Sequence, residues 1–159
     1  GVVSLTESEA HRGDDEQSLQ ETYAAMRAKV RESFADFAAR LPVGQGDHRL
    51  MGTSGTVTTL ASVYLNLPSY DRRQIDGLHL PTSAMREISQ TLASRPPKGR
   101  AEFPTIGHER ADLVVAGCAI LETIFDIWPG ERLGVADRGI REGILRALMA
   151  SDARRRKRR

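Results

Sequence analysis

The segment from Arg49 to Ala61 constrains the fold most, because it predicts a short buried strand, a turn rich in glycine and hydroxyl groups, and the start of a helix. Gly52 and Gly55 let the backbone bend sharply and approach a ligand without interference from a Cβ atom. The helix that follows points unpaired N–H groups back at this turn, and such a terminus attracts anions, phosphate above all. The same residues also suit a structural role, in which Thr53 or Ser54 caps the helix and the glycines form a tight turn.

Two long segments have helical periodicity. The first begins near Asp15, and its apolar stripe predicts a helix that packs on a sheet: Leu19, Tyr23, Met26, Val30, Phe34 and Phe37. Its other face predicts a solvated surface: Arg27, Lys29, Arg31, Glu32 and Asp36. The second helix, predicted over residues 109–128, is apolar on more than one face, which indicates burial between layers. Gly117 inside it costs about 1 kcal/mol relative to alanine, which favours close packing with another backbone.

Shorter elements alternate with these helices. The composition predicts strands over residues 1–6 and 132–136 and a short strand or extended segment over residues 75–80. It also predicts a helix through residue 92 with Pro81 or Thr82 near its N-cap, and a last helix through residues 144–149 after a turn over residues 137–143. Alternation of strands and helices predicts an α/β fold with helices covering a sheet.

Two of the predicted strands end in turns that lead into helices, at 52–56 and at 137–139. Ligands of open α/β sheets bind outside the carboxyl ends of the strands, so we expect both turns to face one cleft. Gly52, Thr53, Ser54, Gly55 and Thr56 are therefore the first candidate phosphate-binding residues.

The composition excludes several classes of protein. The 159 residues suit one domain, and no run approaches the roughly 18 apolar residues of a membrane span. The single cysteine, Cys118, excludes an internal disulfide and fits a buried thiol in a cytoplasmic protein. The four histidines lack metal-ligand spacing.

The net charge of +2 depends on the six basic residues 154–159. Without them, 17 basic residues remain against 21 acidic ones, a balance of −4. This composition predicts a disordered basic tail over residues 151–159 after a domain over residues 1–150. Six adjacent cations attract any polyanion, including nucleic acid, independently of its sequence. The alternative is that the tail only increases solubility.

Three segments carry a resemblance in their order and spacing: Gly52–Ala61, Glu109–Leu121 and Val135–Leu145, with support from Gly1–Glu7. Together they resemble the exopolyphosphatase / guanosine-pentaphosphate phosphohydrolase family of bacteria, over nearly the whole chain to about Ala150. The resemblance implies a ribonuclease-H-like lobe of the actin-like fold, a mixed sheet flanked by helices that lacks its first strands. It covers the second of the family's two lobes. The family's Asp-x-Gly-Gly-Gly-Ser-Thr phosphate loop, catalytic glutamate and magnesium-binding aspartate have no counterpart in this chain.

The resemblance also implies a function. The complete enzyme is expected to release terminal phosphate from polyphosphate or guanosine pentaphosphate. It is expected to use Mg²⁺, and the resemblance places both the Mg²⁺ ligands and the first lobe outside this chain. A homodimer is a further expectation. Arg110 joins the 52–56 turn as a candidate phosphate ligand, because its planar fork pairs with phosphate, and an ion pair with Asp112 or near Glu109 is the alternative. Asp137 and Arg141 are expected to cap and brace the last helix. A non-catalytic phosphate-binding module remains the competing function.

Overall fold

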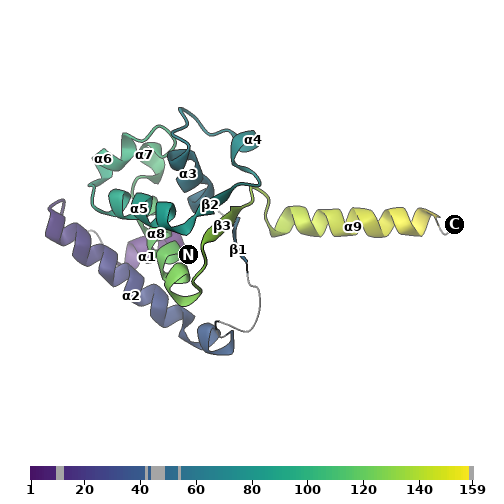
Figure 1. Ribbon diagram of the computed structural model, residues 1–159, viewed down its shortest axis with the longest axis horizontal. Coiled ribbons are helices and arrows are strands. Elements are labelled where there is room, and N and C mark those ends of the chain that lie inside the picture. The colour runs from purple at the N-terminus through teal and green to yellow at the C-terminus, as the bar shows by residue number, and fades with distance from the viewer. Residues whose placement is uncertain (10–12, 42, 44–48, 54, 158–159) are drawn as a thin grey trace.

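The computed structural model describes residues 1–9, 13–41, 43, 49–53 and 55–157. Its strands are β1 (Leu50–Gly52), β2 (His79–Pro81) and β3 (Arg132–Val135). Its helices, which surround these strands in Figure 1, are α1 (Val2–Ser8), α2 (Glu16–Arg40), α3 (Gly55–Tyr64), α4 (Arg72–Ile75), α5 (Thr82–Ala93), α6 (Pro97–Ala101), α7 (Gly107–Arg110), α8 (Leu113–Ile127) and α9 (Ile140–Lys157).

The strands form a small mixed sheet in the order β1-β3-β2. β1 pairs with β3 in parallel, with Leu50 opposite Leu133 and Gly52 opposite Val135, whereas β2 pairs with β3 antiparallel. The predicted α/β class with a mixed sheet flanked by helices is confirmed. Because β1 and β3 are parallel, the turns that follow them leave the sheet at the same edge.

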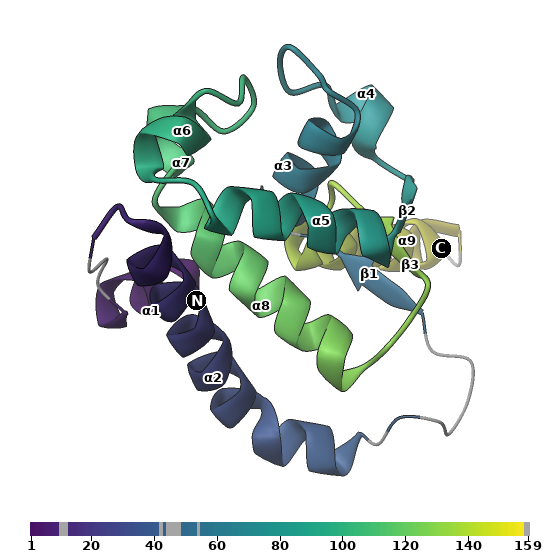
Figure 2. The ribbon, with the colours of Figure 1, turned by 60° about the vertical axis from the view of Figure 1, so that its left-hand side comes forward.

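Helix α8 lies at the centre of the helical layer. It contacts α1, α2 and α5, and Figure 2 shows it between α2 and α5. Most of its residues are buried, as the apolar pattern on more than one face predicts. The predicted helix over 109–128 is nevertheless divided, with α7 ending at Arg110 and α8 beginning at Leu113. Between them the carbonyl of Ala111 accepts a hydrogen bond of 3.3 Å from the buried guanidinium of Arg100.

Helix α2 begins where the sequence predicts, because the Asp15 carboxylate accepts a hydrogen bond from the backbone N–H of Ser18 and so caps the helix. The first four members of the predicted stripe are buried, whereas Phe34 is half-buried and Phe37 is exposed. The main contact of α2 is with α8. The prediction that it packs on the sheet is therefore wrong, since α8 provides the apolar surface that covers this stripe.

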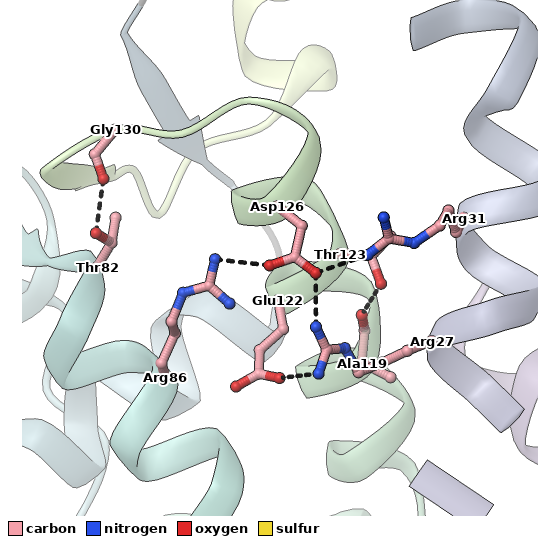
Figure 3. A network of polar contacts seen from close by, with 9 residues as sticks. All are labelled: Arg27, Arg31, Thr82, Arg86, Ala119, Glu122, Thr123, Asp126 and Gly130. Carbon is pink, nitrogen blue, oxygen red and sulfur yellow. Dashed lines mark hydrogen bonds and ion pairs between the residues drawn. The ribbon is translucent and has the colours of Figure 1, made fainter. Parts of the chain in front are cut away.

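A carboxylate on α8 gathers three arginines from the two neighbouring helices (Figure 3). Asp126 Oδ2 accepts hydrogen bonds from Arg27 at 2.6 Å and Arg31 at 2.9 Å, and its Oδ1 lies 2.9 Å from Arg86. Arg27 also lies 3.3 Å from the buried carboxylate of Glu122. The face of α2 predicted to be solvated thus includes two arginines that fasten it to α8.

The strand predicted over residues 1–6 is wrong, and the strand or extended segment predicted over residues 75–80 is confirmed only at His79 and Leu80, which begin β2. The segment predicted as a strand over 1–6 begins α1, because Val2 and the buried Leu5 lie one turn apart and turn toward the core. The segment 75–80 is also divided: α4 ends at Ile75, and Gly77 adopts a φ of +89°, which interrupts an extended chain before β2.

Helix α9 extends away from the rest of the molecule (Figure 1). The carboxylate of Glu142 accepts a hydrogen bond of 2.8 Å from the Gly139 N–H and caps the start of this helix. The sequence predicts disorder from residue 151, but α9 continues to Lys157, because alanine, arginine and lysine are strong helix formers. Within the described ranges, no helix is long and apolar enough to cross a membrane.

The Asp126 cluster predicts a specific loss of stability. Asp126→Asn removes the charge that three guanidinium groups share, and we expect it to lower the free energy of unfolding by about 1.5–3 kcal/mol at pH 7. Asp36→Asn, an exposed position on the same α2 helix as Arg27 and Arg31, is the control and should change it by less than about 0.5 kcal/mol. Chemical denaturation measures both variants.

The same cluster predicts an acid dependence. Burial raises the pKa of Asp126, but the hydrogen bonds from Arg27 and Arg86 outweigh it and hold the pKa below its ordinary value. The stabilisation is therefore complete above the unfolded-state pKa of about 4 and is lost as the pH falls through the lowered folded-state pKa. The difference between wild type and Asp126→Asn should narrow between pH 5 and pH 3, and an undiminished difference contradicts this assignment.

Candidate functional site

The two turns that the sequence places after strands lie side by side. The N–H of Ala136, directly after β3, donates a hydrogen bond of 2.9 Å to the carbonyl of Gly52 at the end of β1. The two turns thus leave the same edge of the sheet, but residues 137–139 do not line the cavity at this edge, so the prediction that both turns face one cleft is not confirmed.

A cavity of about 580 Å³ opens beside this edge, between β1, α3 and α8. Four of the predicted site residues line it: Gly52, Gly55, Thr56 and Arg110. Thr53 is exposed and does not line it, and Ser54 lies outside the described residues. The sequence therefore identifies residues from two distant segments that the fold brings to one cavity.

Gly52 and Gly55 differ in whether their position could accommodate a side chain. A Cβ atom on Gly52 would lie 2.5 Å from Cγ2 of Val57, so this position needs glycine for the strand to approach the first turn of α3. Gly55 begins α3, and a Cβ atom there meets no atom within 4 Å. The backbone φ of Gly55 is not positive, so this residue does not adopt the left-handed conformation that favours glycine. The expected need for glycine at Gly55 is thus not supported by the geometry.

Arg110 reaches the cavity from α7. Its Nη1 donates a hydrogen bond of 3.3 Å to the hydroxyl of Thr59, a buried residue on the second turn of α3. Among the described residues, the ion pairs do not include the alternative pair with Asp112 or Glu109. The sequence missed Thr59 as a member of the site, because its position in a helix predicts only a core residue.

The position of Arg110 depends on Arg100, which is buried. Arg100 donates hydrogen bonds to the carbonyls of Leu92, at 2.9 Å, and Ala111, at 3.3 Å. It therefore ties the residue after Arg110 to the end of α5. The buried guanidinium of Arg100 thus links α5 to the segment between α7 and α8.

Helix α8 closes the cavity through a contact that only glycine allows. A Cβ atom on Gly117 would lie 2.3 Å from the hydroxyl oxygen and 3.0 Å from the Cβ atom of Thr56. The predicted close approach at Gly117 is confirmed, although its neighbour is the Thr56 side chain rather than a backbone. The hydroxyl that lines the cavity is positioned by this contact.

The second turn has a different role from the one predicted. Asp137 lies 2.8 Å from Nε of Arg72, and its N–H donates to the carboxylate of Asp76 at 3.0 Å. Because Glu142 caps α9, the expectation that Asp137 caps that helix is wrong. Burial, together with a hydrogen bond to Asp137, raises the pKa of Tyr70 to about 12, so this hydroxyl stays protonated at neutral pH.

The cavity combines one positive charge and a few polar groups with an aliphatic floor. Arg110 supplies a positive charge, Thr56 supplies a hydroxyl, and the start of α3 supplies N–H groups. The floor consists of aliphatic side chains from β1, β3 and α8. No carboxylate occurs among the described residues that line the cavity, and the described residues contain no group of acidic, histidine or cysteine side chains that fits a metal ion. The residues therefore fit a bound anion, and they do not fit a general base or a Mg²⁺ ion.

Cys118 does not contribute to this site. It is fully buried in α8, and burial raises the pKa of its thiol to about 12. The thiolate needed for nucleophilic chemistry is thus disfavoured, as the sequence predicted for a small buried side chain.

Comparison with known proteins identifies relatives of the chain. Residues 1–152 match the Ppx/GppA phosphatase family. The chain is 30% identical over 124 residues to exopolyphosphatase 2 of Mycobacterium tuberculosis, a match that covers 78% of this chain and 38% of that protein. The chain therefore spans well under half of the length of this curated relative.

Solved structures support the fold. A Ppx/GppA phosphatase of Aquifex aeolicus is 25% identical with a TM-score of 0.71, and the match covers 91% of this chain and 46% of that one. An exopolyphosphatase of Cytophaga hutchinsonii is 18% identical with a TM-score of 0.78, covering 95% of this chain and 48% of that one. These neighbours have the actin-like fold, so the resemblance that implied a lobe of this fold is confirmed.

The contact at Gly117 predicts how the site responds to added volume. Gly117→Ala places a methyl group against Thr56, and we expect it to cost about 1–3 kcal/mol of stability despite the higher helix propensity of alanine. Removing the obstructing side chain in Gly117→Ala/Thr56→Ala should recover most of this loss.

Gly143→Ala on exposed α9 is the matched control for this prediction. An added Cβ atom meets nothing within 4 Å there, so alanine should be neutral or stabilising by up to about 1 kcal/mol. Thermal melting of the variants measures the effects. Equal responses at Gly117 and Gly143 would show that the contact with Thr56 is unimportant.

Proposed function

The chain belongs to the Ppx/GppA phosphatase family, and we propose that it forms the second lobe of an enzyme that removes the terminal phosphate of inorganic polyphosphate or guanosine pentaphosphate. The observation that carries the proposal is the convergence of Arg110, Thr56 and the start of α3 on one cavity, at the edge of the sheet where open α/β sheets bind ligands. The name of the relative, exopolyphosphatase 2, supports a phosphoanhydride substrate.

The residues of this chain act by binding and orienting. Arg110 is exposed and held by Thr59, so its remaining N–H groups are free to pair with phosphate oxygens. Thr56 and the N–H groups at the start of α3 donate to the same anion. Such donors stabilise charge on the oxygens of a transferring phosphoryl group, which is the main catalytic contribution that a protein makes to phosphoryl transfer.

The remaining chemistry comes from outside this chain. Hydrolysis also needs a carboxylate that activates water and, in this family, Mg²⁺, and the described residues of the cavity supply neither. We assign both to the first lobe. A cytoplasmic location fits the buried free thiol of Cys118, since a reducing compartment preserves it.

Arg110 provides the direct test of the binding site. With tripolyphosphate as the probe, Arg110→Ala in the chain of 159 residues should weaken binding about tenfold at low salt, equivalent to ~1.4 kcal/mol. Arg40→Ala, at the exposed end of α2, removes the same charge and leaves the basic tail intact, so its affinity should stay within about twofold. Isothermal titration calorimetry compares them, and equal affinities would place binding on the tail.

The division of labour gives a second test. The chain by itself should release no phosphate from polyphosphate or guanosine pentaphosphate above a protein-free blank, because the base and the metal ligands are assigned to the other lobe. Phosphate release that a chelator abolishes would overturn this assignment. The enzyme's complete gene product should hydrolyse one of the two substrates; binding without hydrolysis there would instead favour the non-catalytic module.

A further inference from the structure

The hydroxyl group of Thr59 differs from three other buried hydroxyls of the helical layer in what it contacts. The hydroxyls of Thr58, Ser62 and Thr123 each donate to a backbone carbonyl three or four residues earlier in their own helix. The Thr59 oxygen instead accepts a hydrogen bond of 3.3 Å from Nη1 of Arg110, which lies 51 positions further along the chain. The Thr59 hydroxyl is therefore bonded to a side chain that lines the cavity rather than to its own helix.

The proton of this hydroxyl has no acceptor in the part of the chain that the structure describes. Thr59 is 3% exposed, and within that part the hydrogen bond from Arg110 is the only one that its side chain makes. A hydroxyl group has one proton to donate and two lone pairs that accept, so the bond from Arg110 leaves the proton available. Burial of a donor without an acceptor is unfavourable, and an anion that accepts this proton removes the penalty.

Thr59 lines the same cavity as Thr56 and Arg110. Residues three apart in a helix lie on one face, so the Thr59 side chain follows that of Thr56 one turn along α3, on the side of the cavity. Two hydroxyl groups and one guanidinium group thus meet at the α3 side of the cavity. The described lining residues include no carboxylate that would compete with an anion for these donors.

We propose that Thr59 donates its hydroxyl proton to the anion bound in this cavity, as a ligand beside Arg110 and Thr56. The inference rests on the proposed function, since it requires a phosphate group in that cavity. Acceptance from a guanidinium cation polarises the O–H bond of Thr59, because linked hydrogen bonds strengthen one another. Arg110 and Thr59 then bind oxygens of one terminal phosphate, and the hydrogen bond between them positions both donors before the ligand arrives.

Binding of tripolyphosphate to the chain of 159 residues tests this contact by isothermal titration calorimetry at low salt. Thr59→Val removes the hydroxyl with little change in volume, and we expect it to weaken binding about tenfold without lowering the melting temperature. Thr59→Ser keeps the hydroxyl and should bind within about twofold of the wild type. All variants keep the basic tail, so differences between them report on the cavity.

Thr123→Val is the matched control for the loss of a buried hydroxyl. Thr123 is fully buried in α8, its hydroxyl donates to the carbonyl of Ala119, and it does not line the cavity. The same substitution at this position should leave the affinity for tripolyphosphate within about twofold of the wild type. An equal loss of affinity in Thr123→Val would show that the substitution acts through the fold and would contradict the contact at Thr59.

A double-mutant cycle with Arg110→Ala separates a direct contact from a positioning role. If Thr59 binds the anion itself, Thr59→Val should still weaken binding about threefold when Arg110 is already alanine. No further loss in that background would make Thr59 a positioning residue of Arg110 and would overturn the proposed contact.

Two outcomes distinguish this contact from the function on which it rests. Full affinity in Thr59→Val together with weakened binding in Arg110→Ala would overturn the contact and leave the proposed phosphate site standing. Unchanged affinity in Arg110→Ala would count against the proposed site itself, and the contact at Thr59 would fall with it.

Discussion

The contact between Gly117 and Thr56 determines the geometry on which the rest of this structure depends. A single hydrogen atom at Gly117 lets α8 approach the first turn of α3, and that turn in turn lies against Gly52 through Val57. These two close contacts fix the positions of β1, the start of α3 and α8 relative to one another. Since interiors are close-packed, even one extra methyl group at this point has to displace the residues that line the cavity.

Ion pairs and hydrogen bonds of arginine side chains fix the positions of the outer helices in a similar way. Asp126 on α8 binds Arg27 and Arg31 of α2 together with Arg86 of α5, so one carboxylate connects three helices. On the other side, Arg100 binds two backbone carbonyls and holds the segment that presents Arg110. Fixed helices and a fixed arginine are what an anion site requires, because donors positioned in advance need no reorganisation when the ligand arrives.

The molecule presents two unequal surfaces at its functional edge. The cavity offers cationic and hydroxyl donors above an aliphatic floor, and α9 offers an apolar stripe whose anchor lies at the same edge. In our interpretation the cavity is the surface that binds phosphate. The basic end of the chain, at residues 154–157, lies at the far end of α9 from that edge.

The sequence by itself determined the α/β class, the cores of α2, α3, α5 and α8, and the strands β1 and β3, because periodicity and turn residues are local properties. The general rule for strand ends in open sheets also identified three cavity residues, Gly52, Gly55 and Thr56, and the family resemblance added Arg110. Only the tertiary structure decided that the residues 1–6 are helical, that Arg27 and Arg100 are fastenings, and that Thr59 holds Arg110. These depend on partners between 8 and 99 residues away, and local pattern carries no information about which distant side chain a guanidinium group will meet.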